Sequence, residues 1–213
     1  MSRFMRAATR KKREHLLEVA IRLFIERGYE QVSVDDIIAA TRTSKGTFYH
    51  YFKGKDEILL DLPRKLITII QAWSERKPTQ VPSLEHHINR LLLELAEQVA
   101  PSARLLRSWI ALSLQNDSLK SAMEELQQTL YQSLLRWLPE PGKTNALVSA
   151  FFGTLLLWCS RDDGSDLPAA MRSQLIWVWE GIRHTAEERT ATLEEEPKGE
   201  FHMQVAIIGG GLA

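Results

Sequence analysis

Residues 44–60 read SKGTFYHYFKGKDEILL and put two tyrosines, a histidine and three lysines around two phenylalanines. Successive residues of a helix are offset by about 100°, so Phe48 and Phe52 share one face, and Gly46 and His50 lie opposite. Burial of the two phenylalanines turns a small, hydroxylic and aromatic surface outward. A surface of this kind, flanked by lysines, is typical of a segment that lies against a polyanion.

The residues before this stretch complete a helix-turn-helix unit. The run KKREHLLEVAIRLFIER has apolar residues at helical spacing and ends at Gly28, which supplies a left-handed position. Ser33 is the predicted N-cap of a short second helix with Asp35 and Asp36 in its first turn, and Ser44 is the N-cap of a third helix over residues 45–52. Three short helices, the last two joined by a tight turn, predict a DNA-binding fold.

Charge is distributed unevenly along the chain, although the formal net charge is zero. Residues 1–55 hold 12 Lys and Arg against 6 Asp and Glu, which gives +6, and the remainder holds 15 against 21, which gives −6. A basic module joined to an acidic body predicts that the N-terminal part meets nucleic acid or another anionic surface.

With its preceding helices, the run TSKGTFYHYFKGKDEIL resembles the signature of the TetR family of bacterial transcriptional repressors over roughly residues 10–60. The resemblance implies an all-helical homodimer that binds an operator in double-stranded DNA and responds to a small-molecule effector. By position it also implies DNA contacts, mostly to phosphates, while Lys45, Thr47 and His50 are candidates for base edges. The full set of predicted DNA-binding residues is Ser33, Arg42, Thr43, Lys45, Gly46, Thr47, Tyr49, His50 and Lys55.

Arg42 departs from the family pattern, which usually has glycine in the turn. We expect Arg42 either to accept a left-handed backbone at some cost or to bend the turn differently. A contact of its guanidinium with a phosphate would offset that cost.

Beyond residue 55 the chain reads as helices separated by Pro, Gly and Asn breakers, with no strand pattern. We predict an all-α fold with a fourth helix over residues 55–77, a helix capped by Ser83, a break near Asn116, and further helices over residues 145–160 and up to about residue 189. The predicted domains are residues 1–54 for DNA binding, 55–190 for ligand binding and dimerisation through six helices, and a flexible tail over 191–213.

The 17 residues 144–160 carry no charge, which admits two interpretations. A membrane span is disfavoured because polar residues interrupt the run and because the next helix is amphipathic. A dimer interface formed with the next helix is the simpler prediction. Two recognition helices would then read a near-palindromic operator.

Five aromatic residues are scattered over the helices that would surround a central cavity and suggest a small apolar or aromatic effector. These candidates are Trp73, Trp109, Tyr131, Phe151 and Trp158. Packing in the core is the alternative for each of them.

No catalytic or metal-ligand spacing stands out, so we predict that the protein is not an enzyme and has no cofactor or metal. The ending MQVAIIGGGLA resembles the first strand and glycine turn of a flavoprotein, but only as a fragment. Cys159 lies in an apolar run and is expected to be buried and inert. The basic start of the chain lacks the apolar core of a secretory signal, which predicts a cytoplasmic location. A helix-turn-helix module that binds protein rather than DNA remains an alternative.

Overall fold

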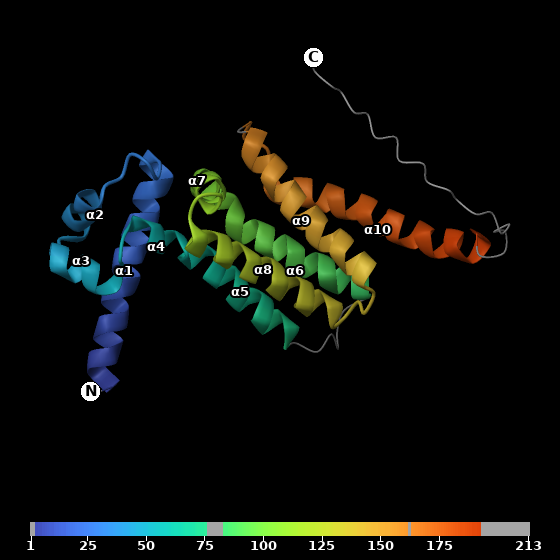
Figure 1. Ribbon diagram of the computed structural model, residues 1–213, viewed down its shortest axis with the longest axis horizontal. Helices are drawn as coiled ribbons and strands as arrows, with labels where there is room; N and C mark the ends of the chain where they lie inside the picture. Colours follow the sequence, from blue (N-terminus) through green and yellow to red (C-terminus); the bar gives the residue numbers. More distant parts are fainter. Residues whose placement is uncertain (1–2, 76–82, 162, 193–213) are drawn as a thin grey trace, which may run out of the picture. The chain divides into compact units, whose positions relative to one another are not determined.

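The computed structural model describes residues 3–75, 83–161 and 163–192, and every regular element in these ranges is a helix, as predicted (Figure 1). Residues 1–179 form one compact unit and residues 180–213 a second, whose described part is the end of the last helix. The elements are α1 (Arg3–Arg27), α2 (Val34–Thr41), α3 (Lys45–Tyr51), α4 (Lys55–Leu59), α5 (Asp61–Ser74), α6 (Leu84–Val99), the 3-10 turn η1 (Ala100–Ser102), α7 (Ala103–Ser113), α8 (Asp117–Leu135), α9 (Pro141–Arg161) and α10 (Leu167–Thr192).

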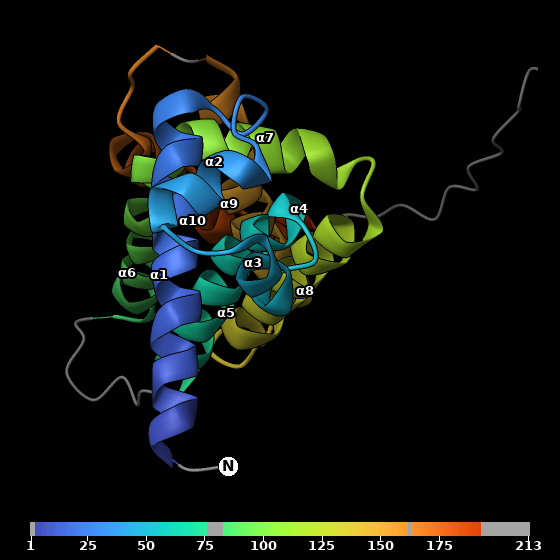
Figure 2. The same cartoon turned by 90° about the vertical axis from the view of Figure 1, so that its left-hand side faces the viewer.

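The first three helices form the predicted helix-turn-helix unit, in which α2 packs against both α1 and α3 (Figures 1 and 2). Its core is aromatic and aliphatic: Phe24, Ile37 and Phe48 are completely buried, and Phe52 is 1% exposed. The rings of Phe48 and Phe52 lie 5.8 Å apart, one helical turn from each other. Their burial confirms the predicted inner face of α3.

The single helix predicted over residues 55–77 is wrong, because the chain forms α4 and α5 with a break at Leu60. Pro63 explains the break: proline has no N–H to donate to the carbonyl of residue 59, and its ring crowds that carbonyl. Proline is tolerated in the first turn of a new helix, where it stands in α5. The short α4 therefore joins the helix-turn-helix unit to α5 as a separate element.

The larger part of the chain is a bundle in which α5 packs against α6 and α8, while α8 also packs against α7 and α9. The predicted cap at Ser83 is present and accepts from the backbone N–H of His86. At the predicted break, Asn116 caps α8 and accepts from the backbone N–H groups of Ser118 and Leu119. The helix predicted over residues 145–160 instead begins at Pro141, which suits the first helical position. Completely buried Thr144 donates a hydrogen bond to the carbonyl of Leu138 over 2.8 Å and ties this start to the end of α8.

Helix α9 is two-sided. Leu147, Phe151, Leu155 and Cys159 are buried along one face, and burial raises the pKa of the Cys159 thiol to about 11. The adjacent Leu156 and Leu157 are 53% and 59% exposed. In the part of the chain that the structure describes, no helix combines the length and hydropathy needed to cross a bilayer. Residues 193–213, which include the flavoprotein-like ending and most of the predicted tail, lie outside the described residues.

Candidate nucleic-acid interface

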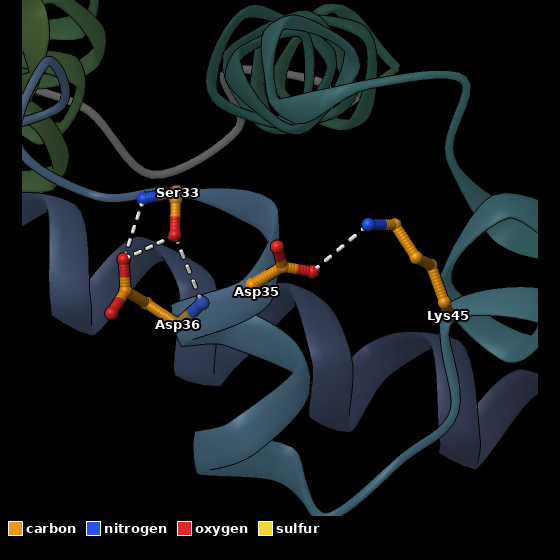
Figure 3. A network of polar contacts seen from close by, with 4 residues as sticks. All are labelled: Ser33, Asp35, Asp36 and Lys45. Carbon is orange, nitrogen blue, oxygen red and sulfur yellow. Dashed lines mark hydrogen bonds and ion pairs between the residues drawn. The ribbon is translucent and has the colours of Figure 1, made fainter.

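Helix α2 begins with a capping box formed by Ser33 and Asp36 (Figure 3). The backbone N–H of Asp36 donates to Ser33 Oγ over 3.1 Å, and the backbone N–H of Ser33 donates to Asp36 Oδ2 over 2.8 Å. Hydrogen bonds from the Ser33 side chain and backbone hold the pKa of the Asp36 carboxyl below its usual range. The exposed Ser33 hydroxyl is thus part of the cap and stands at the positive end of the α2 dipole.

The turn between α2 and α3 is left-handed at Arg42, with φ 51° and ψ 41°. Arg42 is the one non-glycine residue with positive φ among the described residues. The backbone N–H of Thr43 then bonds the carbonyl of Ile38 over 3.2 Å, which closes the end of α2 in the manner of a Schellman motif. Of the two predicted alternatives, the chain adopts the left-handed backbone and accepts its cost of about 1–2 kcal/mol.

Helix α3 is capped by Ser44, whose Oγ accepts from the backbone N–H of Thr47 over 3.1 Å. The hydroxyls of Ser44 and Thr47 lie 2.9 Å apart, and those of Thr41 and Thr43 are also 2.9 Å apart. Two predicted contact residues, Thr43 and Thr47, are therefore half-buried and held in short hydroxyl pairs at the edges of the turn.

The outward side of α3 carries Lys45, Gly46, Tyr49 and His50, all of them exposed. Tyr49 is 50% exposed although its ring packs edge-on against buried Phe48 at 5.3 Å. Lys45 Nζ lies 3.2 Å from Asp35 Oδ1, which links the start of α3 to α2 across the turn (Figure 3). Since both side chains of this pair are more than half exposed, the pair adds little stability and leaves Lys45 able to exchange partners.

Gly46 has no internal reason to be glycine. A Cβ atom built on it would meet a single neighbour within 4 Å, Ser44 Oγ at 4.0 Å, which is ordinary contact. Glycine inside a helix costs about 1 kcal/mol relative to alanine. The fold would therefore be more stable with alanine, and no contact within the domain requires glycine at this position.

Lys55 is held by the protein itself. Its Nζ donates to the carbonyls of Tyr29 and Val32 over 3.0 and 3.2 Å and lies 4.2 Å from the centre of the Tyr29 ring. The ammonium has three donors, so at most one is left for a phosphate. In this structure Lys55 fastens the loop before α2 to the start of α4.

Asp56 joins the same loop to the larger bundle. The Tyr29 hydroxyl donates to Asp56 Oδ1, and Asn116 Nδ2 donates to Asp56 Oδ2 over 3.5 Å. Burial, followed by the hydrogen bond to Asp56, raises the pKa of the Tyr29 hydroxyl above its usual value. A second link runs from Arg104 of α7, which donates to the Glu26 carbonyl over 3.1 Å. Sequence reasoning missed these contacts because they join residues 27 to 78 positions apart.

The five candidate ligand residues fall into different surroundings. Trp73 is 3% exposed and stacks on His87, with ring centres 4.4 Å apart, and Trp137 meets both rings edge-on. Tyr131 lines a hollow of about 580 Å³ between α8 and α9 together with Phe152. Trp109 and Phe151 are buried in the bundle, and Trp158 donates to the Ser165 carbonyl over 2.6 Å.

The Trp73 cluster has buried polar atoms without partners. The indole nitrogens of Trp73 and Trp137 and Nε2 of His87 are buried and make no hydrogen bond in the structure. An unsatisfied buried polar atom costs about 1–3 kcal/mol, so these three nitrogens destabilise the cluster in this arrangement. Burial, followed by the charge of Arg90, lowers the pKa of His87. His87 and Trp137 were not among the predicted residues, since their stacking arises from packing between helices.

No group of three or more His, Cys, Asp or Glu side chains that could hold a metal ion occurs within the described ranges.

Residues 16–62, which span α1 to the start of α5, match the family model described as "Bacterial regulatory proteins, tetR family". This segment contains the capping box, the left-handed turn and the whole of α3. The Tn10 TetC protein of Escherichia coli is 36% identical over 64 residues, which are 30% of this chain and 32% of that protein. Over this segment the chain is similar to TetR-family regulators.

Two further comparisons show the same similarity. The transcriptional repressor DhaR of Mycobacterium sp. GP1 is 36% identical over 67 residues, or 28% of this chain and 34% of DhaR. The chain thus spans about a third of the length of the curated relatives it matches. The structure of the TetR-family repressor FadR of Thermus thermophilus in complex with lauroyl-CoA is 26% identical, covers 79% of this chain and 94% of its own, and has a TM-score of 0.60.

Replacement of Arg42 tests the cost of the left-handed turn. Glycine adopts positive φ without strain but loses more conformational entropy on folding, so Arg42→Gly should raise the free energy of unfolding by about 0.5–1 kcal/mol. Arg42→Ala retains a Cβ and should leave it within about 0.5 kcal/mol of the native value. Urea unfolding monitored by circular dichroism measures both, and equal stability of the two variants would show that the turn is not strained.

Proposed function

We propose that this protein is a cytoplasmic, ligand-responsive transcriptional regulator that binds a near-palindromic operator as a dimer and represses until a small apolar or aromatic effector releases it. The observation that carries the proposal is the outward surface of α3. There a glycine without an internal role stands beside exposed Lys45, Tyr49 and His50. This arrangement suits a helix whose backbone approaches the floor or wall of a DNA groove.

In this mechanism, phosphate contacts position the domain and base edges specify the sequence. Lys45, Thr47 and His50 are the side chains proposed for base edges. Ser33, Arg42, Thr43 and Tyr49 are proposed for phosphates, and Lys55 contributes through its one remaining donor. In the free protein the ion pair with Asp35 keeps the Lys45 side chain oriented. When DNA binds, Lys45 exchanges this exposed partner for the DNA.

The dimer is proposed to form through the solvent-facing sides of α9 and α10. Leu156, Leu157, Ile176 and Trp177 are 53–70% exposed, so two consecutive helices both display large apolar side chains. Exposed apolar residues grouped on neighbouring elements mark interaction sites. A two-fold dimer would present two α3 helices to successive major grooves, about 34–36 Å apart.

The effector is proposed to bind at the Trp73, His87 and Trp137 cluster. The rings offer an apolar, planar surface, and the two unpartnered indole N–H groups are donors that require an acceptor. An aromatic or apolar molecule with a carbonyl or carboxylate oxygen meets both needs. FadR of Thermus thermophilus, whose structure holds lauroyl-CoA, offers an example of an apolar chain joined to a carbonyl group.

Effector binding would reach the DNA-binding domain through α5, which carries Trp73 and follows α4 directly. The contacts of Asp56 with Tyr29 and Asn116 would be made in one arrangement of the domains and altered in the other. An effector that binds one arrangement more tightly shifts the population toward it.

Selection against a random duplex library tests DNA recognition, and Gly46→Ala is the informative variant. Alanine should raise the free energy of unfolding by about 0.5–1 kcal/mol, yet its methyl group should weaken binding to the selected duplex about tenfold or more. Gly142→Ala in the first turn of α9 is the matched control, because a Cβ there meets nothing within 4 Å. Measurement of stability and of duplex affinity for all three proteins separates folding from contact.

A more stable Gly46→Ala protein that binds DNA as well as the native chain would contradict the proposed role of α3. Enrichment of no sequence at all would favour a helix-turn-helix module that binds protein.

The dimer predicts a clear effect of charge on the exposed apolar residues of α9 and α10. Leu157→Glu combined with Trp177→Glu should raise the dimer dissociation constant at least about a hundredfold, because two charges per protomer would be buried. Leu114→Glu is the control, since Leu114 is 84% exposed and stands at the end of α7, outside α9 and α10. Sedimentation equilibrium measures the assembly state, and a dimer that survives the double change would place the interface elsewhere.

The proposed effector site predicts that the indole N–H of Trp73 donates a hydrogen bond to the effector. In a screen of aromatic acids and acyl-CoA thioesters for release of the selected duplex, Trp73→Phe should weaken the response to an active compound about tenfold, since it keeps a ring but removes the donor. Trp179→Phe removes an indole donor that is already paired with Asn89 Oδ1 outside the cluster, so it should leave the response unchanged. Equal responses of both variants and the native protein would exclude Trp73 as an effector donor.

A further inference from the structure

Helix α1 extends beyond the helix-turn-helix core. Both views show its N-terminal half projecting past α2 and α3 (Figures 1 and 2). The point of exit is marked by Arg13, whose guanidinium carbon lies 5.0 Å from the centre of the Phe52 ring at the end of α3. Arg13 stands ten positions after Arg3, the first residue of α1, which corresponds to about 15 Å at 1.5 Å per residue.

This projecting segment is uniformly basic in sequence. Residues 3–13 contain six Arg and Lys and no Asp or Glu, and the first acidic residue is Glu14. Within the segment, Arg10, Lys11 and Lys12 are exposed. The ion pair of Arg10 with Glu14 spans 3.4 Å between side chains that are 78% and 57% exposed, so it holds the arginine only weakly.

One face of α1 changes character where the helix leaves the core. Leu17, Ala20 and Phe24 are buried along this face. At helical spacing the same face continues backward to Arg13 and then to Arg10, which lies three residues before it. The face that packs inside the domain is thus apolar, and its continuation past the end of α3 is basic. Lys11 is offset from Arg13 by about 160° and lies on the opposite side.

We propose that this basic face, Arg10 with Arg13, binds the DNA backbone outside the base pairs that α3 reads. The proposal rests on the proposed DNA-binding function and names a second contact region for it. The contact of Arg13 with Phe52 ties the face to the end of α3, and its charge complements phosphate. At 3.4 Å per base pair, a segment of about 15 Å covers roughly four flanking base pairs on each side of the operator.

Loss of the flanking contact should lower the affinity for DNA but should not alter the sequence preference, since phosphates carry no sequence information. Each phosphate that a lysine or arginine neutralises adds about 0.9 to the slope of log affinity against log salt concentration. A duplex that ends at the operator should therefore bind with a shallower slope than one with six extra base pairs on each side.

The test compares Arg10→Gln with Lys11→Gln on the long and short duplexes at several salt concentrations. Both substitutions remove one charge from the same helix and keep a good helix former, but only Arg10 lies on the face toward α3. Arg10→Gln should reduce the salt slope on the long duplex by about 0.9 per protomer and leave binding to the short duplex unchanged. Lys11→Gln should reduce the slope by less than half as much.

The proposal would be overturned if the two variants lost equal amounts of salt slope. It would also be overturned if the native protein bound the long and short duplexes with the same slope. In either case the operator would still be bound. If the native protein selects no duplex, the proposed function itself fails, which is a different result. Thermal melting of both variants, expected within about 2 °C of the native protein, checks that a lost slope does not reflect lost folding.

Discussion

Burial of Phe48 and Phe52 against the first two helices determines which side of α3 faces outward. With these two rings 5.8 Å apart and withdrawn from solvent, the helix cannot rotate about its axis without exposing one of them. The positions of Gly46, Tyr49 and His50 follow from that single constraint. The capping box of α2 and the left-handed residue before α3 then set the angle at which this surface is offered. The interface is therefore defined by packing behind it rather than by contacts within it.

Features that depend on residues close together in the sequence were largely predictable. Ser33, Ser44 and Ser83 were recognisable as caps because their side chains satisfy backbone groups only a few residues away. The inner face of α3 followed from helical spacing alone. For Arg42, the sequence left two alternatives, a left-handed backbone or a differently bent turn, because sterics allow few conformations in a tight turn. The break at Leu60 also had a local signal in Pro63, which the prediction of a single helix over residues 55–77 did not take into account.

Features that depend on distant partners were not predictable. The ammonium of Lys55 bonds carbonyls 23 and 26 residues earlier, so its sequence position suggested only an exposed charge. The stacking of Trp73 on His87 likewise depends on how α5 meets α6. In both cases the residue type indicated what the side chain is able to do, and the packing of helices determined what it does. The partnerless nitrogens of the aromatic cluster are visible only once that packing is known.

Cys159, described above as a buried thiol on the inner face of α9, makes the molecule suited to site-directed labelling. It is the one cysteine in the sequence, is 3% exposed, and has its pKa raised by burial to about 11. Because the thiolate is the reactive form, this side chain stays largely inert to maleimides and nitroxide reagents at neutral pH. A cysteine introduced on the exposed side of α3 would react alone. If the proposed dimer forms, probes attached there in both protomers would report how far apart the two α3 helices stand, with and without the proposed effector.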